Sequence, residues 1–112
     1  MPDLPENGTL LRIFISEEAR HGHQLLYESI VIKAKKEGLA GATVFRGIMG
    51  FQANKEIHTS NMLRLSENLP VVIEIVDDTD KINHFIPIVK EIVDDGLITT
   101  EKANIIKTVK NT

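Results

Sequence analysis

An arginine and two glycines in the middle of the chain have the residue types and the spacing that could bind an anion. Arg46 and Gly47 are followed by Gly50 and Phe51, and a long polar stretch comes next. Glycines let the backbone adopt positive φ and approach a ligand closely, so successive N–H groups can form a nest for phosphate or carboxylate. A Gly-x-x-Gly spacing also marks places where a strand bends into a hairpin, and on spacing alone that structural interpretation is favoured.

Three histidines are the candidate metal ligands. His21 and His23 flank a glycine just ahead of an expected helix, and His58 lies in the polar stretch. Imidazoles bind divalent metals, but no ligand spacing connects these three. The favoured interpretation is that His21 and His23 cap the helix N-terminus or contact an anion there. We therefore expect no metal.

Patterns for catalysis are weak in this sequence. The serines lack the context of a nucleophile elbow, and acidic pairs such as Glu17-Glu18 have the placement of surface charge beside helices. The chain has no cysteine, which excludes a disulfide scaffold, a cysteine nucleophile and a thiolate metal site. We expect a protein that is not an enzyme.

The composition is that of an ordinary globular protein with one domain spanning residues 1–112. Of its 112 residues, 42% are hydrophobic and 26% are charged. A net charge of -3, one tyrosine and no tryptophan argue against nucleic acid as a partner. The N-terminus lacks the pattern of a signal peptide, and no apolar run approaches the roughly 20 residues of a spanning helix. We expect a cytoplasmic protein without direct membrane insertion.

Hydrophobic periodicity predicts six elements after a loose arm at residues 1–8. In order they are a strand at 9–15, a helix at 22–37 stopped by Gly38, a strand at 42–48, a strand at 70–76, a helix from Asp78 or Thr79 that ends at Gly96, and a strand within 97–109. The order is βαβ twice. The predicted fold class is α+β, a ferredoxin-like split βαβ (βαββαβ) sandwich with a long loop between its second and third strands.

Two helices cover only one face of a four-stranded sheet, yet the strands at 9–15 and 70–76 are apolar on both faces. Another copy of the protein is the expected cover of the second face. These two strands are central neighbours in this topology, so Arg12 and Glu74 are expected to form an ion pair. A structural pair is favoured over a catalytic one.

The segment between the second and third strands runs for about twenty residues, longer than a hairpin needs, and such segments often carry function. Three segments of the sequence carry a resemblance to a known family: L-R-I-F-I-S-E at 11–17, G-A-T-V-F-R-G-I-M-G-F at 41–51 and L-P-V-V-I-E-I-V at 69–76. Over nearly the whole chain they resemble a family of small bacterial and archaeal proteins long described as a domain of unknown function. That family is related to the PII signalling proteins, in which a similar strand leads to a G-F-G segment that opens the T-loop. Gly50 and Phe51 match the first two residues of G-F-G, which makes residues 49–62 a T-loop-like segment.

The resemblance implies a PII-like homotrimer that binds a small anionic effector between subunits. The implied effector is an adenine nucleotide (ATP, ADP or AMP), and the implied target is a membrane transporter or an enzyme contacted through a mobile loop. This sequence departs from PII at Gln52, where PII has glycine, and after Pro70, where PII has lysine; it also lacks a G-D-G-K segment. Binding of 2-oxoglutarate in the PII manner is therefore not expected, and the phosphate anchors must differ.

The candidate binding residues come from the loop, its base and the available cations: Arg12, Arg46, Gly47, Gly50, Phe51, Gln52, His58 and Arg64. The alternative function is a divalent-metal trimer that uses the histidines, because CutA is another trimeric relative with the same fold.

Overall fold

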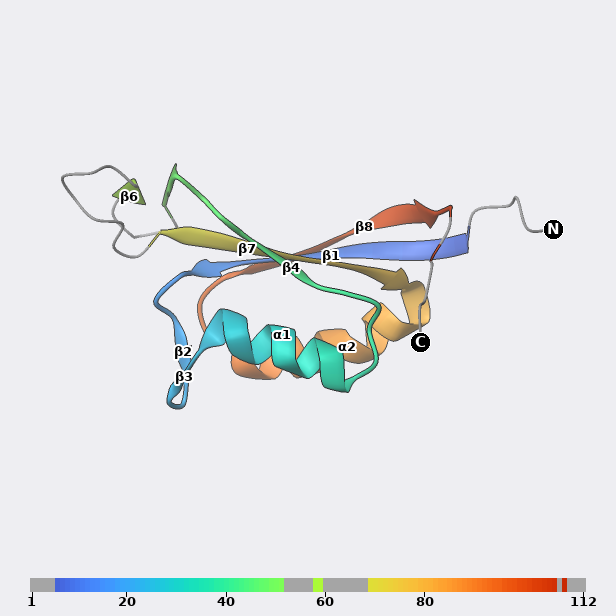
Figure 1. Ribbon diagram of the computed structural model, residues 1–112, viewed down its shortest axis with the longest axis horizontal. Coiled ribbons are helices and arrows are strands. Elements are labelled where there is room, and N and C mark those ends of the chain that lie inside the picture. The colour runs from blue at the N-terminus through green and yellow to red at the C-terminus, as the bar shows by residue number, and fades with distance from the viewer. Residues whose placement is uncertain (1–5, 52–57, 60–68, 107, 109–112) are drawn as a thin grey trace.

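A four-stranded antiparallel sheet carries two helices on one of its faces in the computed structural model (Figure 1). The structure describes residues 6–51, 58–59, 69–106 and 108. The sheet order is β4-β7-β1-β8, and the elements that build the sandwich are β1 (Glu6–Ser16), α1 (Leu26–Lys36), β4 (Thr43–Arg46), β7 (Pro70–Asp78), α2 (Thr79–Ile92) and β8 (Leu97–Ile105). The predicted double βαβ fold is confirmed.

Two short antiparallel pairs complete the described part of the chain. β2 (Arg20–His21) pairs with β3 (Gln24–Leu25), and β5 (Met49–Gly50) pairs with β6 (His58–Thr59). The first pair lies between β1 and α1, and the second lies beyond the end of β4.

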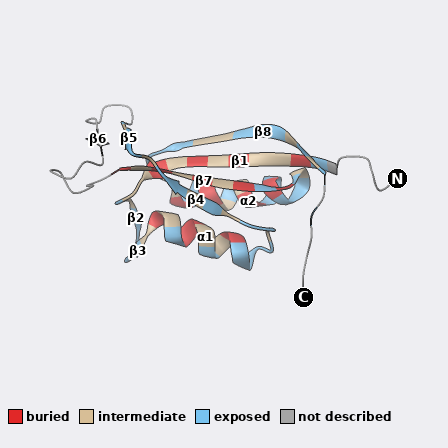
Figure 2. Ribbon diagram, turned by 45° about the horizontal axis from the view of Figure 1, so that its top comes forward, coloured by how far each residue is buried: buried red, intermediate tan, exposed pale blue. Residues whose placement is uncertain are grey.

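The core lies between the sheet and the helices because alternate strand residues point to that side. The side chains of β1 that point there, Leu11, Ile13 and Ile15, are fully buried. Ile73 and Ile75 of β7 are at most 1% exposed. They pack with side chains of both helices, as Figure 2 shows by the buried stripes on α1 and α2: Leu26, Ile30, Ala34, Ile82, Phe85, Val89 and Ile92. The helical spacing read from the sequence therefore identified the core faces correctly.

Helix α1 ends as predicted, and its start differs from the prediction. Gly38 has φ +81°, its N–H donates to the carbonyl of Lys35, and the N–H of Leu39 donates to that of Ala34. This is the Schellman arrangement, which needs a left-handed residue. The start predicted at residue 22 is wrong, because residues 20–25 form the β2–β3 hairpin, whose turn includes Gly22 at φ +65°.

Three other predicted boundaries need correction. β1 begins at Glu6, so it includes residues 6–8 of the expected loose arm; residues 1–5 lie outside the described residues. β4 is shorter than the predicted 42–48. α2 ends at Ile92, because Val93 is already extended at φ -96° and ψ 106°. Gly96 instead begins the approach to β8, where an added Cβ would lie 2.6 Å from the carbonyl oxygen of Phe14.

No helix in the described ranges is long and apolar enough to cross a membrane.

A buried carboxylate fixes the connection between α1 and β4 against β7. Asp77 is only 8% exposed; its Oδ2 accepts a hydrogen bond from the N–H of Ala40 at 2.8 Å, and its Oδ1 accepts one from the N–H of Asp78 at 2.7 Å. Asp78 itself is exposed and makes no side-chain cap of α2, although it occupies the predicted N-cap position.

We expect Asp77→Ala to lower the free energy of unfolding by about 1–3 kcal/mol, because it leaves the N–H of Ala40 without its acceptor. Asp78→Ala is the matched control and should cost under about 0.5 kcal/mol. Urea unfolding followed by circular dichroism, at one protein concentration, measures both. Equal losses for the two variants would contradict this role of Asp77.

Candidate functional site

The ends of β1 and β4 and the start of β7 lie at the same end of the sheet, where the long central segment leaves and returns (Figure 1). The N–H of Gly47, just past β4, donates to the carbonyl of Pro70 at 2.7 Å, and the N–H of Glu17, just past β1, donates to that of Leu69 at 2.8 Å. The start of β7 is therefore held on both sides. Leu69, which closes this end of the core, is fully buried.

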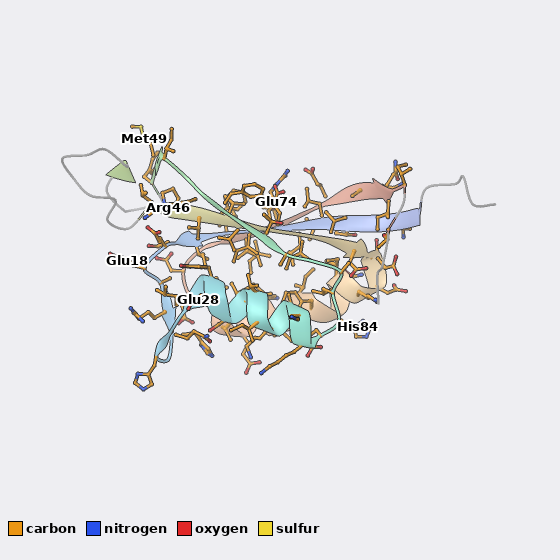
Figure 3. The ribbon with its side chains drawn as sticks, in the orientation of Figure 1. Glu18, Glu28, Arg46, Met49, Glu74 and His84 are labelled. Carbon is orange, nitrogen blue, oxygen red and sulfur yellow. The ribbon has the colours of Figure 1, made fainter. Side chains whose placement is uncertain are left out.

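An ion pair spans β7 at this end of the sheet. Arg46 Nη2 lies 2.8 Å from Glu17 Oε2 and 3.0 Å from Glu17 Oε1. Arg46 is opposite Val71, a core residue, so both partners lie on the helix-facing side of the sheet. The Arg46 side chain, labelled in Figure 3, is 52% exposed, and that of Glu17 is 22% exposed.

Glu17 is the residue of this site that sequence reasoning missed. It was interpreted with Glu18 as surface charge beside a helix. The strand register would have found it: β1 and β4 flank β7, and their last residues reach the same end of that strand.

Gly47 and Gly50 both pack against Pro70. A Cβ at Gly47 would lie 2.9 Å from Pro70 Cγ and 3.2 Å from its carbonyl oxygen, and a Cβ at Gly50 would lie 2.8 Å from Cγ. Positive φ occurs at Gly22 and Gly38 among the described glycines, so the left-handed backbone expected here is wrong. Close approach is the reason for both glycines, and the approach is to Pro70.

The residues around these glycines are apolar and exposed. Ile48, Met49 and Phe51 are 77%, 60% and 68% exposed, and Met49 is labelled beside Arg46 in Figure 3. Such a group next to an arginine can pack on the apolar part of a ligand or on a neighbouring molecule.

Arg12 is not brought to this end of the sheet. It lies on the face away from the helices, where its Nε is 2.9 Å from Glu74 Oε2 and its Nη1 is 3.5 Å from Glu101 Oε2. The hydrogen bond to Glu74 is the main cause that raises the pKa of Arg12. The predicted structural pair of Arg12 and Glu74 is confirmed, and Glu101 is an additional partner.

Other predicted binding residues lie partly or wholly outside the described residues. Gln52 and Arg64 belong to the undescribed part, as does most of the T-loop-like segment 49–62. His58 is placed by its backbone, opposite Gly50 in the β5–β6 pair.

The described residues contain no group of three or more His, Asp or Glu that could hold a metal ion. His21 and His23 are exposed on the β2–β3 hairpin. The N-cap of α1 is Leu25, with no side-chain cap, so the expected capping by these histidines is wrong.

Among the hollows lined by described residues, two lie away from this end of the sheet. One of about 390 Å³ on the outer sheet face is lined by Arg12, Phe14, Phe45, Val72 and Glu74. The other, of about 570 Å³, lies along α2 and is lined by Asn83, Ile86, Pro87, Lys90 and Glu91. Both hollows are open to solvent. The first is lined by apolar side chains and the Arg12–Glu74 ion pair, and the second is lined by residues of α2 alone.

The model of the family DUF190, described as "Uncharacterized ACR, COG1993", matches residues 8–105, which is most of the chain. The chain belongs to the DUF190 family. A UPF0166 protein of Aquifex aeolicus (strain VF5) is 42% identical over 97 residues, covering 87% of this chain and 91% of that protein. The resemblance read from the sequence is confirmed.

Solved structures show the same fold. The nitrogen regulatory PII-like protein CPII from Thiomonas intermedia K12, bound to ADP, AMP and bicarbonate, has a TM-score of 0.64 at 10% identity, over 90% of each chain. The divalent ion tolerance protein CutA1 from Ehrlichia chaffeensis has a TM-score of 0.57 at 20% identity, covering 95% of this chain and 86% of that one. At these identities the likeness establishes that this DUF190 protein has a PII-like, ferredoxin-like fold.

We expect Gly50→Ala to destabilise the protein by about 1–3 kcal/mol, as overpacking does, because its Cβ would meet the Pro70 ring. The double variant Gly50→Ala/Pro70→Ala should recover most of that loss relative to Pro70→Ala alone. Pro70→Ala should recover less of the stability lost in Gly47→Ala, because the Cβ at position 47 would also meet the carbonyl oxygen of residue 70. Thermal unfolding of the set measures the coupling. Additive losses for Gly50 and Pro70 would contradict this explanation of the glycine.

Proposed function

We propose that this DUF190 protein is a PII-like signalling protein. In this proposal it assembles as a homotrimer, binds an adenine nucleotide at subunit boundaries near Arg46 and Phe51, and reports the ligand to a partner protein through its central loop. The observation that carries the proposal is the likeness, over 90% of the chain, to a PII-like protein bound to ADP and AMP. The non-enzymatic role and the cytoplasmic location expected from the sequence stay predictions, as does the absence of nucleic acid as a partner.

The outer face of the sheet supports self-association. Both helices lie on the other face, and no described element covers this one (Figure 1). Three large apolar residues on this face remain exposed: Phe45 at 51%, Val76 at 42% and Leu97 at 56%. Exposed apolar areas on a sheet are covered by association, and a second copy presents the same apolar surface.

The position of β4 supports a ligand site at a subunit boundary. β4 is an edge strand of the described sheet, so Arg46 and the exposed Phe51 just beyond it lie at the margin of one protomer. A neighbouring protomer beside this edge would bring further side chains to that margin. The missing phosphate anchors would then come from two chains.

The residues present fit a phosphate ligand in part. A guanidinium is well suited to phosphate, and that of Arg46 is half exposed. The N–H of Gly47, by contrast, already donates to Pro70, so it is not available as a member of a nest. Within the described residues, the proposed anion site therefore relies on Arg46 rather than on the N–H of Gly47.

The alternative candidate is a metal-binding trimer, and its support is the fold likeness to CutA1 together with His21 and His23. Exposure of both histidines and the lack of a third described ligand place it second.

We expect light scattering to give a mass about three times that of the 12.5 kDa chain. Phe45→Glu should dissociate the assembly, because it places a charge in the hollow of the outer face. Ile32→Glu is the matched control: Ile32 is similarly exposed, at 42%, but lies on α1, and its variant should remain assembled. A wild-type mass near that of one chain would contradict the proposed assembly.

We expect calorimetry to detect binding of ATP, ADP or AMP. Arg46→Gln should raise the dissociation constant by a factor of about ten or more, since a hydrogen bond to a charged group is lost. Arg20→Gln, which removes the same charge from the β2–β3 hairpin, should bind like the wild type. Binding of zinc or copper without any binding of nucleotide would reverse the ranking of the two functions.

A further inference from the structure

The two partners of the Arg46–Glu17 pair are held very differently. Glu17 is fixed by its own backbone, because its N–H is bonded to the carbonyl of Leu69, and its side chain is 22% exposed. Arg46 reaches the carboxylate at the end of a long side chain that is 52% exposed. The backbone of Glu17 is thus held in place and its carboxylate is the more buried partner, whereas the more exposed guanidinium has room to change partner.

The contact uses little of the guanidinium. Both carboxylate oxygens are approached by the single nitrogen Nη2, at 2.8 and 3.0 Å, which is not the two-nitrogen fork that makes arginine–carboxylate pairs strong. Within the described residues, Nε and Nη1 of Arg46 have no protein partner. Because both two-nitrogen forks of a guanidinium include Nη2, a phosphate group that binds Arg46 through a fork has to take Nη2 from Glu17.

We propose that Glu17 is an internal competitor for Arg46, which a phosphate-bearing effector must displace in order to bind. This inference rests on the proposed function and goes beyond it by naming the group that opposes the ligand. The effector replaces a one-nitrogen contact with a two-nitrogen contact to a more highly charged acceptor. Glu17 then lowers the apparent affinity and sets the effector concentration at which the protein responds.

Displacement would change one side-chain link and leave the sheet intact. The bonds from Gly47 to Pro70 and from Glu17 to Leu69 run between backbone atoms, so they do not depend on the ion pair. Only the direct bridge from the end of β1 to the end of β4 is lost. That bridge lies where the chain enters and leaves the central segment, so its state is tied to ligand occupancy at the base of the segment.

Calorimetric titration of the full-length protein with ADP, and separately with inorganic pyrophosphate, tests the inference. Glu17→Gln should bind about two- to fivefold more tightly, the range that corresponds to a partly exposed ion pair. Glu18→Gln is the control, because its side chain has the same charge one residue away and takes no part in the Arg46 contact. Glu17→Asp, which keeps the charge but shortens the reach, should shift the affinity in the same direction and serves if Glu17→Gln fails to fold.

The decisive comparison is made in the Arg46→Gln background, where Glu17→Gln should no longer change the affinity. A general effect of negative charge would persist there and would also appear for Glu18→Gln; either outcome overturns the inference.

If the wild type binds ADP and Glu17→Gln binds it equally, the inference fails and the proposed function stands. If ADP does not bind but pyrophosphate does, with the predicted dependence on Glu17 and Arg46, the nucleotide function fails and the competitor role stands. Absence of binding by both probes to every variant overturns both.

Discussion

The rest of this structure depends on how the apolar faces of the two central strands are buried. β1 and β7 are apolar on both faces, and α1 and α2 together satisfy only the inner face, where Ile13 and Ile73 are completely buried. The outer face keeps exposed apolar side chains around an ion pair. Removal of such an area from water favours association, which is the physical basis of the proposed assembly. A single chain leaves this face of the sheet exposed.

The same strand arrangement concentrates the candidate chemistry at one end of the sheet. β7 begins between β1 and β4, and its first residues accept backbone bonds from both neighbours. Pro70 fits there only because Gly47 and Gly50 have no side chains. Among the described residues at this end, the half-exposed guanidinium of Arg46 lies beside exposed apolar side chains. In the proposed competition the backbone bonds stay in place and this guanidinium exchanges Glu17 for the phosphate of the effector.

Sequence reasoning succeeded where the signal was periodic and failed where it depended on distant pairing. Short apolar runs rich in β-branched residues identified the strands, and helical spacing identified the helices and their core faces. Central pairing of two strands was enough to place Arg12 against Glu74. The partnership of Arg46 with Glu17 requires two strand registers at once, which local patterns do not contain. Gly96 was interpreted as a helix stop because of its residue type, whereas Val93 had already ended the helix by turning extended.

Hydrogen–deuterium exchange with and without ADP tests the central claim most directly, because it reports where a ligand acts without any substitution. The account predicts slower exchange in peptides that cover residues 43–51 and the start of β7, and unchanged exchange along 83–91 of α2, where the larger hollow lies. Unchanged exchange throughout at saturating ADP, or protection confined to α2, would contradict it.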